Sequence, residues 1–142
     1  MTSTDYAKAR RLLARRDPVI AALIKQHGPC GLADAQHEDA FTALTHAIIS
    51  QQPTTKAAAT IAKRFDALFD GRPTCAAVAR LTDEQLRAVG FSSQKVRYIR
   101  DLSARVADGS VPLKTVNELS DEVRIQSLAR LKGIGRWTGE MF

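Results

Sequence analysis

The C-terminal stretch reads Leu128-Ala129-Arg130-Leu131-Lys132-Gly133-Ile134-Gly135-Arg136-Trp137-Thr138-Gly139-Glu140-Met141-Phe142. This pattern predicts a helix, a Gly-x-Gly turn and the beginning of a second helix. Gly133 and Gly135 have no Cβ atom, so the turn can adopt positive φ and its backbone can approach another molecule closely. Amide N–H groups in such a turn suit an anion such as phosphate, and Lys132 and Arg136 add positive charge beside them. We therefore interpret this stretch as a helical hairpin that holds a DNA strand by its phosphates without reading bases.

A Gly-x-Gly turn has other uses, and the sequence excludes two of them. No strand precedes the turn and a third glycine is missing, so it is not a dinucleotide-binding loop. No Gly-Lys-Ser/Thr follows, so it is not the phosphate loop of a nucleotide hydrolase. A turn that only joins two packed helices stays open as the alternative.

The composition describes a basic protein with room for one folded domain. The chain has 142 residues, a net charge of +6 and a pI near 9.7, which favours a polyanionic partner such as nucleic acid. A basic surface without a specific partner is the alternative. The densest basic group is expected to form a solvated helix face rather than a binding site; it consists of Lys8, Arg10, Arg11, Arg15 and Arg16.

Targeting and redox features are sparse. The chain has no run of about 18 apolar residues and begins without the apolar core of a signal peptide, so we expect a cytoplasmic, nucleoid-associated protein without a membrane span. Cys30 and Cys75 are expected to be ordinary thiols. The three histidines lack zinc-like spacing, and His46 is expected to have a structural role.

The spacing of apolar residues is helical throughout, with no convincing strand and no linker. Capping and breaking residues bound the predicted helices. These helices cover residues 5–15, Asp17-Pro18 to Gly28-Pro29, 38–51, Thr54 or Thr55 to the turn at Asp70, the capping box at Thr82 to Gly90, Ser92 or Ser93 to Asp108, and Ser120 to the glycine turn.

Two further polar segments are candidate sites. In the first, an apolar helix ends in Ser50-Gln51-Gln52-Pro53-Thr54, where a glutamine can enter a base stack; a polar helix end facing water is the alternative. The second, 90–95, is expected to be structural, with a glycine ending one helix and a serine capping the next. A phosphate contact by Ser93 or Lys95 is the weaker alternative there.

Trp137 is the only tryptophan and follows the glycine turn by two residues. Its indole can stack on a flipped base, preferably a cationic one. The alternative is a core tryptophan that braces the hairpin. Met141 lies four residues later on the same helix face, so it lines the same space or extends the core.

In order and spacing, four segments together resemble the helix-hairpin-helix superfamily of base-excision DNA glycosylases, nearest to its 3-methyladenine DNA glycosylase II branch. They are Asp17-Pro18 through Gly28-Pro29, Phe41 through Ala58, Val89 through Leu102 and Leu131 through Phe142. The resemblance implies an all-α bundle or barrel, incomplete at the C-terminus, with two helical subdomains and a DNA cleft. Residues 1–142 would be the N-terminal part of a glycosylase domain, and 128–142 its hairpin motif.

The resemblance also implies partners and site residues. The partner would be double-stranded DNA containing damaged bases, with no membrane and no obligate protein partner. Gln52 would be the wedge that fills the gap left by a flipped base, and Trp137 and Met141 would form the base pocket. The full set of implied DNA-binding residues is Gln52, Pro53, Lys132, Gly133, Ile134, Gly135, Arg136 and Thr138.

No cofactor and no metal on side chains is implied, although a monovalent cation can bind hairpin carbonyls in this superfamily, here around Leu131 and Ile134. Superfamily members that also cut the backbone carry a lysine where this chain has Trp137, so the implied activity is monofunctional base removal. Lys132 and Gly139 depart from the usual proline and alanine.

The catalytic aspartate of the superfamily would fall beyond Phe142, and Glu140 matches a non-catalytic position. We therefore assign no catalytic residue and expect this chain to be inactive. A non-enzymatic helix-hairpin-helix DNA-binding module and a helical protein-interaction scaffold are the alternative functions.

Overall fold

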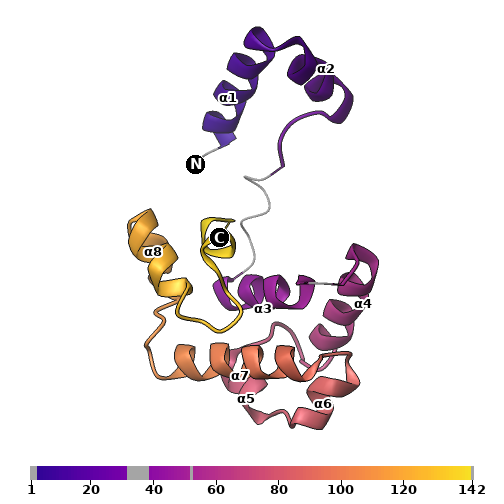
Figure 1. Cartoon of the computed structure of the whole chain (residues 1–142), viewed down its shortest axis with the longest axis vertical. Coiled ribbons are helices and arrows are strands. Elements are labelled where there is room, and N and C mark those ends of the chain that lie inside the picture. Colours follow the sequence, from indigo (N-terminus) through magenta and orange to yellow (C-terminus); the bar gives the residue numbers. More distant parts are fainter. Residues whose placement is uncertain (1–2, 32–38, 52, 142) are drawn as a thin grey trace. The chain divides into compact units, whose positions relative to one another are not determined.

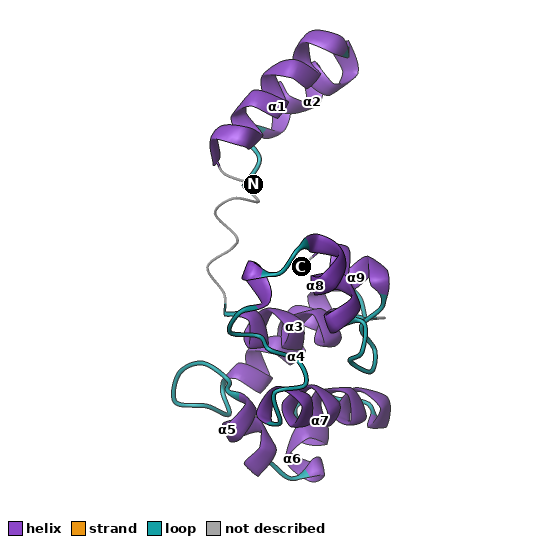
Figure 2. Cartoon of the chain, turned by 90° about the vertical axis from the view of Figure 1, so that its left-hand side faces the viewer, coloured by secondary structure: helices purple, strands orange, loops and turns teal. Residues whose placement is uncertain are grey.

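The computed structural model describes residues 3–31, 39–51 and 53–141 of the chain. Within these ranges all regular elements are helical and no strand occurs, which confirms the predicted all-α class (Figures 1 and 2). The chain divides into two compact units, 1–38 and 39–142. The helices are α1 (Ser3–Arg16), α2 (Pro18–His27), α3 (Ala40–Ser50), α4 (Thr55–Asp66), α5 (Cys75–Arg80), α6 (Asp83–Ala88), α7 (Ser93–Ala107), η2 (Val116–Glu118, a 3₁₀ turn), α8 (Asp121–Leu128) and α9 (Arg136–Met141).

The first unit is a pair of helices, α1 and α2, that pack on each other. Asp17 separates them: its carboxylate accepts hydrogen bonds from the amides of Val19 and Ile20 at 2.7 and 3.0 Å, and Pro18 occupies the first turn of α2. Leu12 and Leu13, the two leucines of α1, are both about half exposed. No residue of α2 is buried. The pair therefore has little core of its own.

The second unit is built around α3 and α7. Helix α7 lies between α3 on one side and α5 and α6 on the other, and α8 packs against α9 (Figures 1 and 2). Helix α3 is the most apolar element, and its Leu44, Ile48 and Ile49 are completely buried. Helices α4, α5, α6, α7 and α8 and the 3₁₀ turn η2 also contribute buried apolar residues to this core, whereas α9 contributes none.

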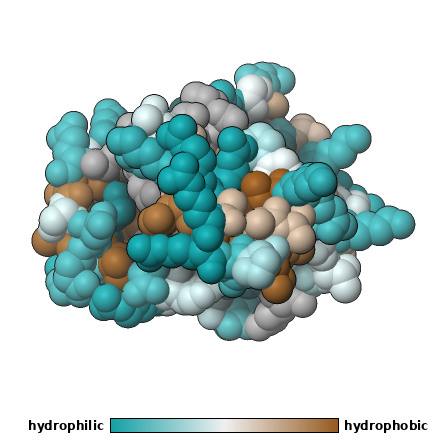
Figure 3. All heavy atoms as spheres, turned by 90° about the horizontal axis from the view of Figure 1, so that it is seen from above, coloured by the Kyte–Doolittle hydropathy of each residue, from teal (hydrophilic) through white to brown (hydrophobic). Residues whose placement is uncertain are grey.

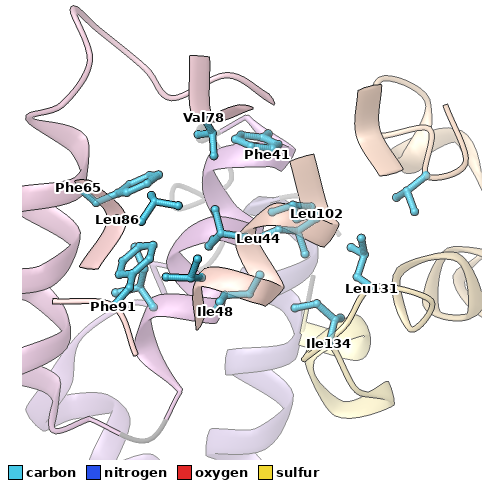
Figure 4. Packing of buried hydrophobic residues seen from close by; sticks show 14 of the residues in the cluster. Phe41, Leu44, Ile48, Phe65, Val78, Leu86, Phe91, Leu102, Leu131 and Ile134 are labelled. Atoms are coloured by element: carbon cyan, nitrogen blue, oxygen red, sulfur yellow. The ribbon is translucent and has the colours of Figure 1, made fainter. Parts of the chain in front are cut away.

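Figure 4 shows the buried side chains converging from α3, α5, α6, α7 and the turn before α9. Phe65, at the end of α4, is completely buried and makes an edge contact with Phe69 and a stacked contact with Phe91, with ring centroids 5.1 and 5.3 Å apart. Truncating a buried phenylalanine to alanine typically costs about 3–5 kcal/mol, so this trio is a major part of the core. Phe91, directly after Gly90, is thus buried against Phe65.

Several predicted details are wrong. Helix α5 was not expected, because six residues are too few to show a helical period. The Thr74 side chain caps its first turn, and Val78 is its buried residue. Helix α4 ends at Asp66, before the predicted end at Asp70, and Leu68 lies beyond the helix and is 38% exposed. On α8, Ile125 and Leu128 are buried, while Val123 is exposed.

The exposed hydrophobic residues do not form one continuous patch on the face drawn in Figure 3. The face drawn in Figure 3 carries hydrophilic side chains with separate patches of hydrophobic ones between them. Among the helices in the described ranges, none has the length and apolar character needed to cross a bilayer. Cys30 is exposed and Cys75 partly buried, and both are free thiols.

Asp39 fixes the beginning of α3. Its carboxylate accepts hydrogen bonds from the amides of Phe41 and Thr42, both at 3.1 Å, and from the Thr42 hydroxyl at 2.5 Å. Burial on its own raises the pKa of the Asp39 carboxyl, but these hydrogen bonds outweigh it and hold the pKa below its ordinary value. The ionised form is therefore the one that stabilises the fold.

We expect Asp39→Ala to lower the free energy of unfolding by about 1 kcal/mol at pH 7, because the first turn of α3 loses its cap. The folded-state pKa is depressed, so the contribution is fully present above the unfolded pKa of about 3.9 and disappears as the pH falls through the folded value. Urea unfolding at pH 7 and below pH 3 measures both effects. Asp39→Asn, which still caps, is the control; equal stability of Asp39→Ala and the unsubstituted protein at pH 7 contradicts the assignment.

Candidate nucleic-acid interface

The turn between α8 and α9 is anchored on α7. The backbone N–H of Lys132 donates a 2.9 Å hydrogen bond to the Asp101 carboxylate, which also accepts one from Arg105 Nε at 3.1 Å. The Lys132 ammonium lies 3.8 Å from the same carboxylate, whose side chain is only 12% exposed. Asp101 therefore holds the backbone of the turn through a charge-assisted hydrogen bond from a largely buried position.

The two glycines of the turn have different structural requirements. Gly133 has φ +84°, and a Cβ atom there would lie 2.3 Å from the ring of Tyr98. The Tyr98 hydroxyl accepts a hydrogen bond from Gln94 Nε2 at 2.5 Å, which holds the ring in place. A Cβ atom on Gly135 would meet nothing within 4 Å. Gly133 is thus required by the fold, whereas Gly135 faces open space.

The end of α3 lies beside this turn. Gln51 Nε2 donates a hydrogen bond to the Gly133 carbonyl oxygen at 2.6 Å, across 82 residues of sequence. Lys95 of α7 donates from its ammonium group to the Ile49 carbonyl at 2.5 Å. The glutamine segment and the glycine turn, separate candidate sites in the sequence, are therefore neighbours.

Lys95 corrects the sequence interpretation, which left a phosphate contact open for it. Its side chain is 9% exposed and satisfies the last turn of α3, so it is not available at the surface. Burial lowers the pKa of the Lys95 ammonium below its ordinary value. Ser93, the other candidate, accepts a hydrogen bond from Arg87.

Gln52, the predicted wedge, lies outside the described residues. Pro53 lies at the mouth of a pocket of about 310 Å³ between α3 and α4, which His46, Ser50 and Thr55 also line. His46 Nε2 lies 3.2 Å from both carboxylate oxygens of Asp66, so this histidine joins the two helices as expected.

The amides of the turn divide into used and available ones. The N–H of Ile134 donates to the Leu131 carbonyl at 3.1 Å, and the Ile134 side chain is buried. Within the described part of the chain, the amides of Arg136 and Trp137 have no acceptor, and neither do those of Gly133, Gly135 and Thr138, the three that the superfamily resemblance assigns to DNA. These three donors can bind an external anion without breaking an internal hydrogen bond.

The charged side chains beside the turn are already paired. Arg136 makes a two-point contact with Glu122 at 3.0 and 3.1 Å and a third hydrogen bond to Glu140 at 2.8 Å. Hydrogen bonding to Arg136 holds the pKa of the Glu122 carboxyl below its ordinary value, and the same contacts raise the pKa of Arg136. The sequence suggested free positive charge here, but carboxylates balance most of it.

Trp137 and Met141 point away from the core. They are 73% and 66% exposed, which excludes the interpretation of Trp137 as a brace inside the hairpin. On the opposite side of α9, Gly139 is buried and approaches α8 so closely that a Cβ atom would lie 3.4 Å from the Ile125 Cα. The glycine thus lets the two helices pack while the indole faces outward.

Side chains that ligate metals do not cluster: in the searched, described ranges no group of three His, Cys, Asp or Glu could hold an ion. The backbone carbonyl oxygens of the turn, in contrast, have unused acceptor capacity. The Leu131 carbonyl accepts a single hydrogen bond and keeps a second lone pair, and the Ile134 carbonyl accepts none from the described residues. Both oxygens therefore keep lone pairs that no described donor uses.

Comparison with known proteins agrees with the helical hairpin and its packing. The family model of the HhH-GPD superfamily of base excision DNA repair proteins matches residues 45–139, and this chain belongs to that superfamily. The superfamily membership expected from the sequence is thereby confirmed.

Similarity to individual relatives extends over most of the chain. This chain is 29% identical to the alkylbase DNA glycosidase-like protein mag2 of Schizosaccharomyces pombe, over 98% of this chain and 67% of the relative. It is 35% identical to DNA-3-methyladenine glycosylase 1 of the same organism, over 75% of this chain and 48% of the relative. The chain thus spans two thirds or less of the length of these relatives.

Two solved structures share the fold. The 3-methyladenine DNA glycosylase Mag1 of S. pombe, in complex with abasic DNA, matches with a TM-score of 0.80 and 30% identity, over 94% of this chain and 67% of that one. A DNA-3-methyladenine glycosidase from Bacillus halodurans matches with a TM-score of 0.70 and 28% identity, over 89% and 62%.

We expect Gly133→Ala to lower the free energy of unfolding by more than about 1 kcal/mol, because the new methyl group collides with Tyr98 at a positive φ. Gly135→Ala, the matched control, should stay within about 0.5 kcal/mol of the unsubstituted protein because its Cβ meets nothing. Chemical denaturation of both variants measures the difference. Equal stability of the two variants would show that the turn does not pack on Tyr98.

Proposed function

We propose that this protein acts in base-excision repair as a monofunctional DNA glycosylase, which hydrolyses the N-glycosidic bond of alkylated purines such as 3-methyladenine in duplex DNA. One observation carries the proposal: an outward-facing indole, Trp137, follows a turn whose Gly133, Gly135 and Thr138 amides have no internal acceptor. Superfamily membership and the names of the relatives support the choice of substrate.

In this proposal the turn binds the DNA backbone. The open side of Gly135 lets a phosphate come close, and the three available amides donate to its oxygens. A monovalent cation on the Leu131 and Ile134 carbonyls would supply further positive charge there. Because carboxylates already balance Arg136, backbone amides rather than side-chain charges make the main contact.

The segment after α3 would complete the interface. Gln51 ties this segment to Gly133, so Gln52 and Pro53 follow directly from a residue anchored at the turn. A residue that enters the stack beside a bound phosphate can fill the space of an extruded base, which offsets the few kcal/mol needed for flipping. Gln52 has the length and the hydrogen-bonding groups for this task.

Trp137 would receive the extruded base. An indole face attracts a cationic ring, and an alkylated purine carries positive charge, which also makes it a good leaving group. Tryptophan has no nucleophilic amine, so water rather than a protein side chain would attack the sugar carbon that loses the base, which leaves an abasic site. We assign no catalytic carboxylate, since Glu122 and Glu140 are both bound to Arg136.

That pairing of the two carboxylates favours a second candidate function, a non-enzymatic helix-hairpin-helix module that binds DNA. The two candidates differ in Trp137. A glycosylase needs the indole for the damaged base, whereas a module that grips phosphates has no use for it.

Fluorescence anisotropy separates these functions, using duplexes with and without one alkylated purine. For the glycosylase we expect Trp137→Ala to weaken binding to the damaged duplex about tenfold, the equivalent of one lost stacking contact, and to change binding to the undamaged duplex less than about twofold. Gly135→Val should weaken both about tenfold, because its side chain blocks the approach of the backbone.

Damage-independent binding that Trp137→Ala leaves unchanged would favour the module. Absence of DNA binding, or binding that does not weaken with salt, would overturn both functions, since phosphate contacts release counterions. Circular dichroism of each variant controls for folding.

A further inference from the structure

Helix α1 carries a stripe of basic residues, here called the α1 stripe and defined as Lys8, Arg11 and Arg15. Their spacing of three and four residues places them on one face of the helix, and all three are exposed. The opposite face meets α2 around an apolar pocket of about 390 Å³, lined from α1 by Tyr6, Ala9, Arg10 and Leu13. The stripe is thus directed away from the helix on which α1 packs.

The charges of the α1 stripe are uncompensated. In the described ranges, Lys8, Arg11 and Arg15 form no ion pair. Arg136 of the hairpin contrasts with this arrangement, since it is held by Glu122 and Glu140. Helix α1 contains five basic residues and a single acidic one, Asp5. Free positive charge is therefore more concentrated on α1 than at the hairpin turn.

The geometry of the stripe suits a phosphodiester chain. Seven residues of helix separate Lys8 from Arg15, which is about 10 Å at a rise of 1.5 Å per residue. Successive phosphates of one DNA strand are about 3.4 Å apart along the axis, so the stripe spans about three of them. Arginine, with its planar fork of donors, binds phosphate oxygens at two points.

An anionic membrane is a poorer match for this face. Surface-bound helices bury a broad apolar face in the lipid boundary. On α1, Leu13 turns toward the pocket shared with α2, and Leu12 is the one large apolar residue beside the stripe. A narrow, polar, cationic stripe fits the exposed phosphates of a nucleic acid better than a bilayer.

We propose that the α1 stripe is a second DNA contact, which binds the phosphate backbone of duplex DNA independently of sequence and of damage. This contact lies outside residues 45–139, the part matched by the superfamily. It rests on the proposed function in that both take duplex DNA as the partner. It adds affinity for undamaged DNA, whereas the hairpin turn and Trp137 add recognition of the lesion.

The test is the salt dependence of binding to an undamaged duplex, measured by fluorescence anisotropy between 50 and 200 mM salt. The variant Lys8→Gln/Arg11→Gln/Arg15→Gln keeps good helix formers and removes three charges. We expect the slope of log affinity against log salt to fall by about 2–3, since each lost phosphate contact contributes about 0.9. The control is Arg80→Gln/Arg97→Gln/Lys114→Gln, which removes the same charge from exposed positions of the other unit and should change the slope by less than about 1.

An unchanged slope in the α1 variant overturns the inference, as does an equal change in the control. If the α1 variant loses binding to phosphatidylserine vesicles while DNA binding is unchanged, the stripe belongs to a membrane and the inference fails. If the α1 variant loses slope while Gly135→Val and Trp137→Ala bind the duplex with an alkylated purine as tightly as the unsubstituted protein does, the stripe stands and the proposed function fails. Circular dichroism and thermal unfolding of both triple variants check that the helices are intact.

Discussion

The hydrogen bond from the Lys132 amide to the Asp101 carboxylate holds the glycine turn on α7, and the rest of the interface depends on it. The Lys132 ammonium, 3.8 Å from the same carboxylate, adds a second polar contact between the turn and the helix at the centre of the unit. The amide hydrogen bond places Gly133 on the Tyr98 ring, and Gly133 in turn accepts the hydrogen bond from Gln51. One largely buried carboxylate thus sets the distance between the turn and the end of α3.

Within residues 133–141, some positions are needed for packing and others are free to contact a partner. Gly133 and Gly139 serve packing, the first against Tyr98 and the second against Ile125. Gly135, Trp137 and Met141 do not pack in the core, and they are exposed to a partner. The pairing of Arg136 with two glutamates removes a strong side-chain charge from the turn, which leaves the backbone amides as its main donors.

Much of the fold follows from local signals in the sequence. Asp17, Thr54, Thr82 and Ser92 cap their helices as predicted, because caps depend on residues only two or three positions apart. Helix α5 was missed because six residues do not complete two turns. The burial of Ile125 on α8 depends on a later residue, Gly139, which lets α9 pack closely against it.

The site was predicted in outline, and its missing parts are long-range contacts. Gly133 and Gly135 look equivalent in the sequence; in the structure only Gly133 has a positive φ, and Tyr98, 35 residues earlier, lies against it. In the sequence Lys95 looks like a surface lysine, but in the structure it is bound to the end of α3. Arg136 looks like a free charge, but in the structure Glu122 lies beside it. The exposure of Trp137 excludes a brace inside the hairpin, one of the two interpretations that spacing alone left equal.

The central claim is that the available amides of the turn bind DNA phosphates. Amide chemical shifts, followed by NMR in a ¹⁵N-labelled protein during titration with duplex DNA, test it most directly. The account predicts large, saturable shifts for Gly133, Gly135 and Thr138, and a smaller one for Ile134, whose N–H is already bound to Leu131. Saturable shifts elsewhere in the protein, with these three resonances unmoved, would contradict it.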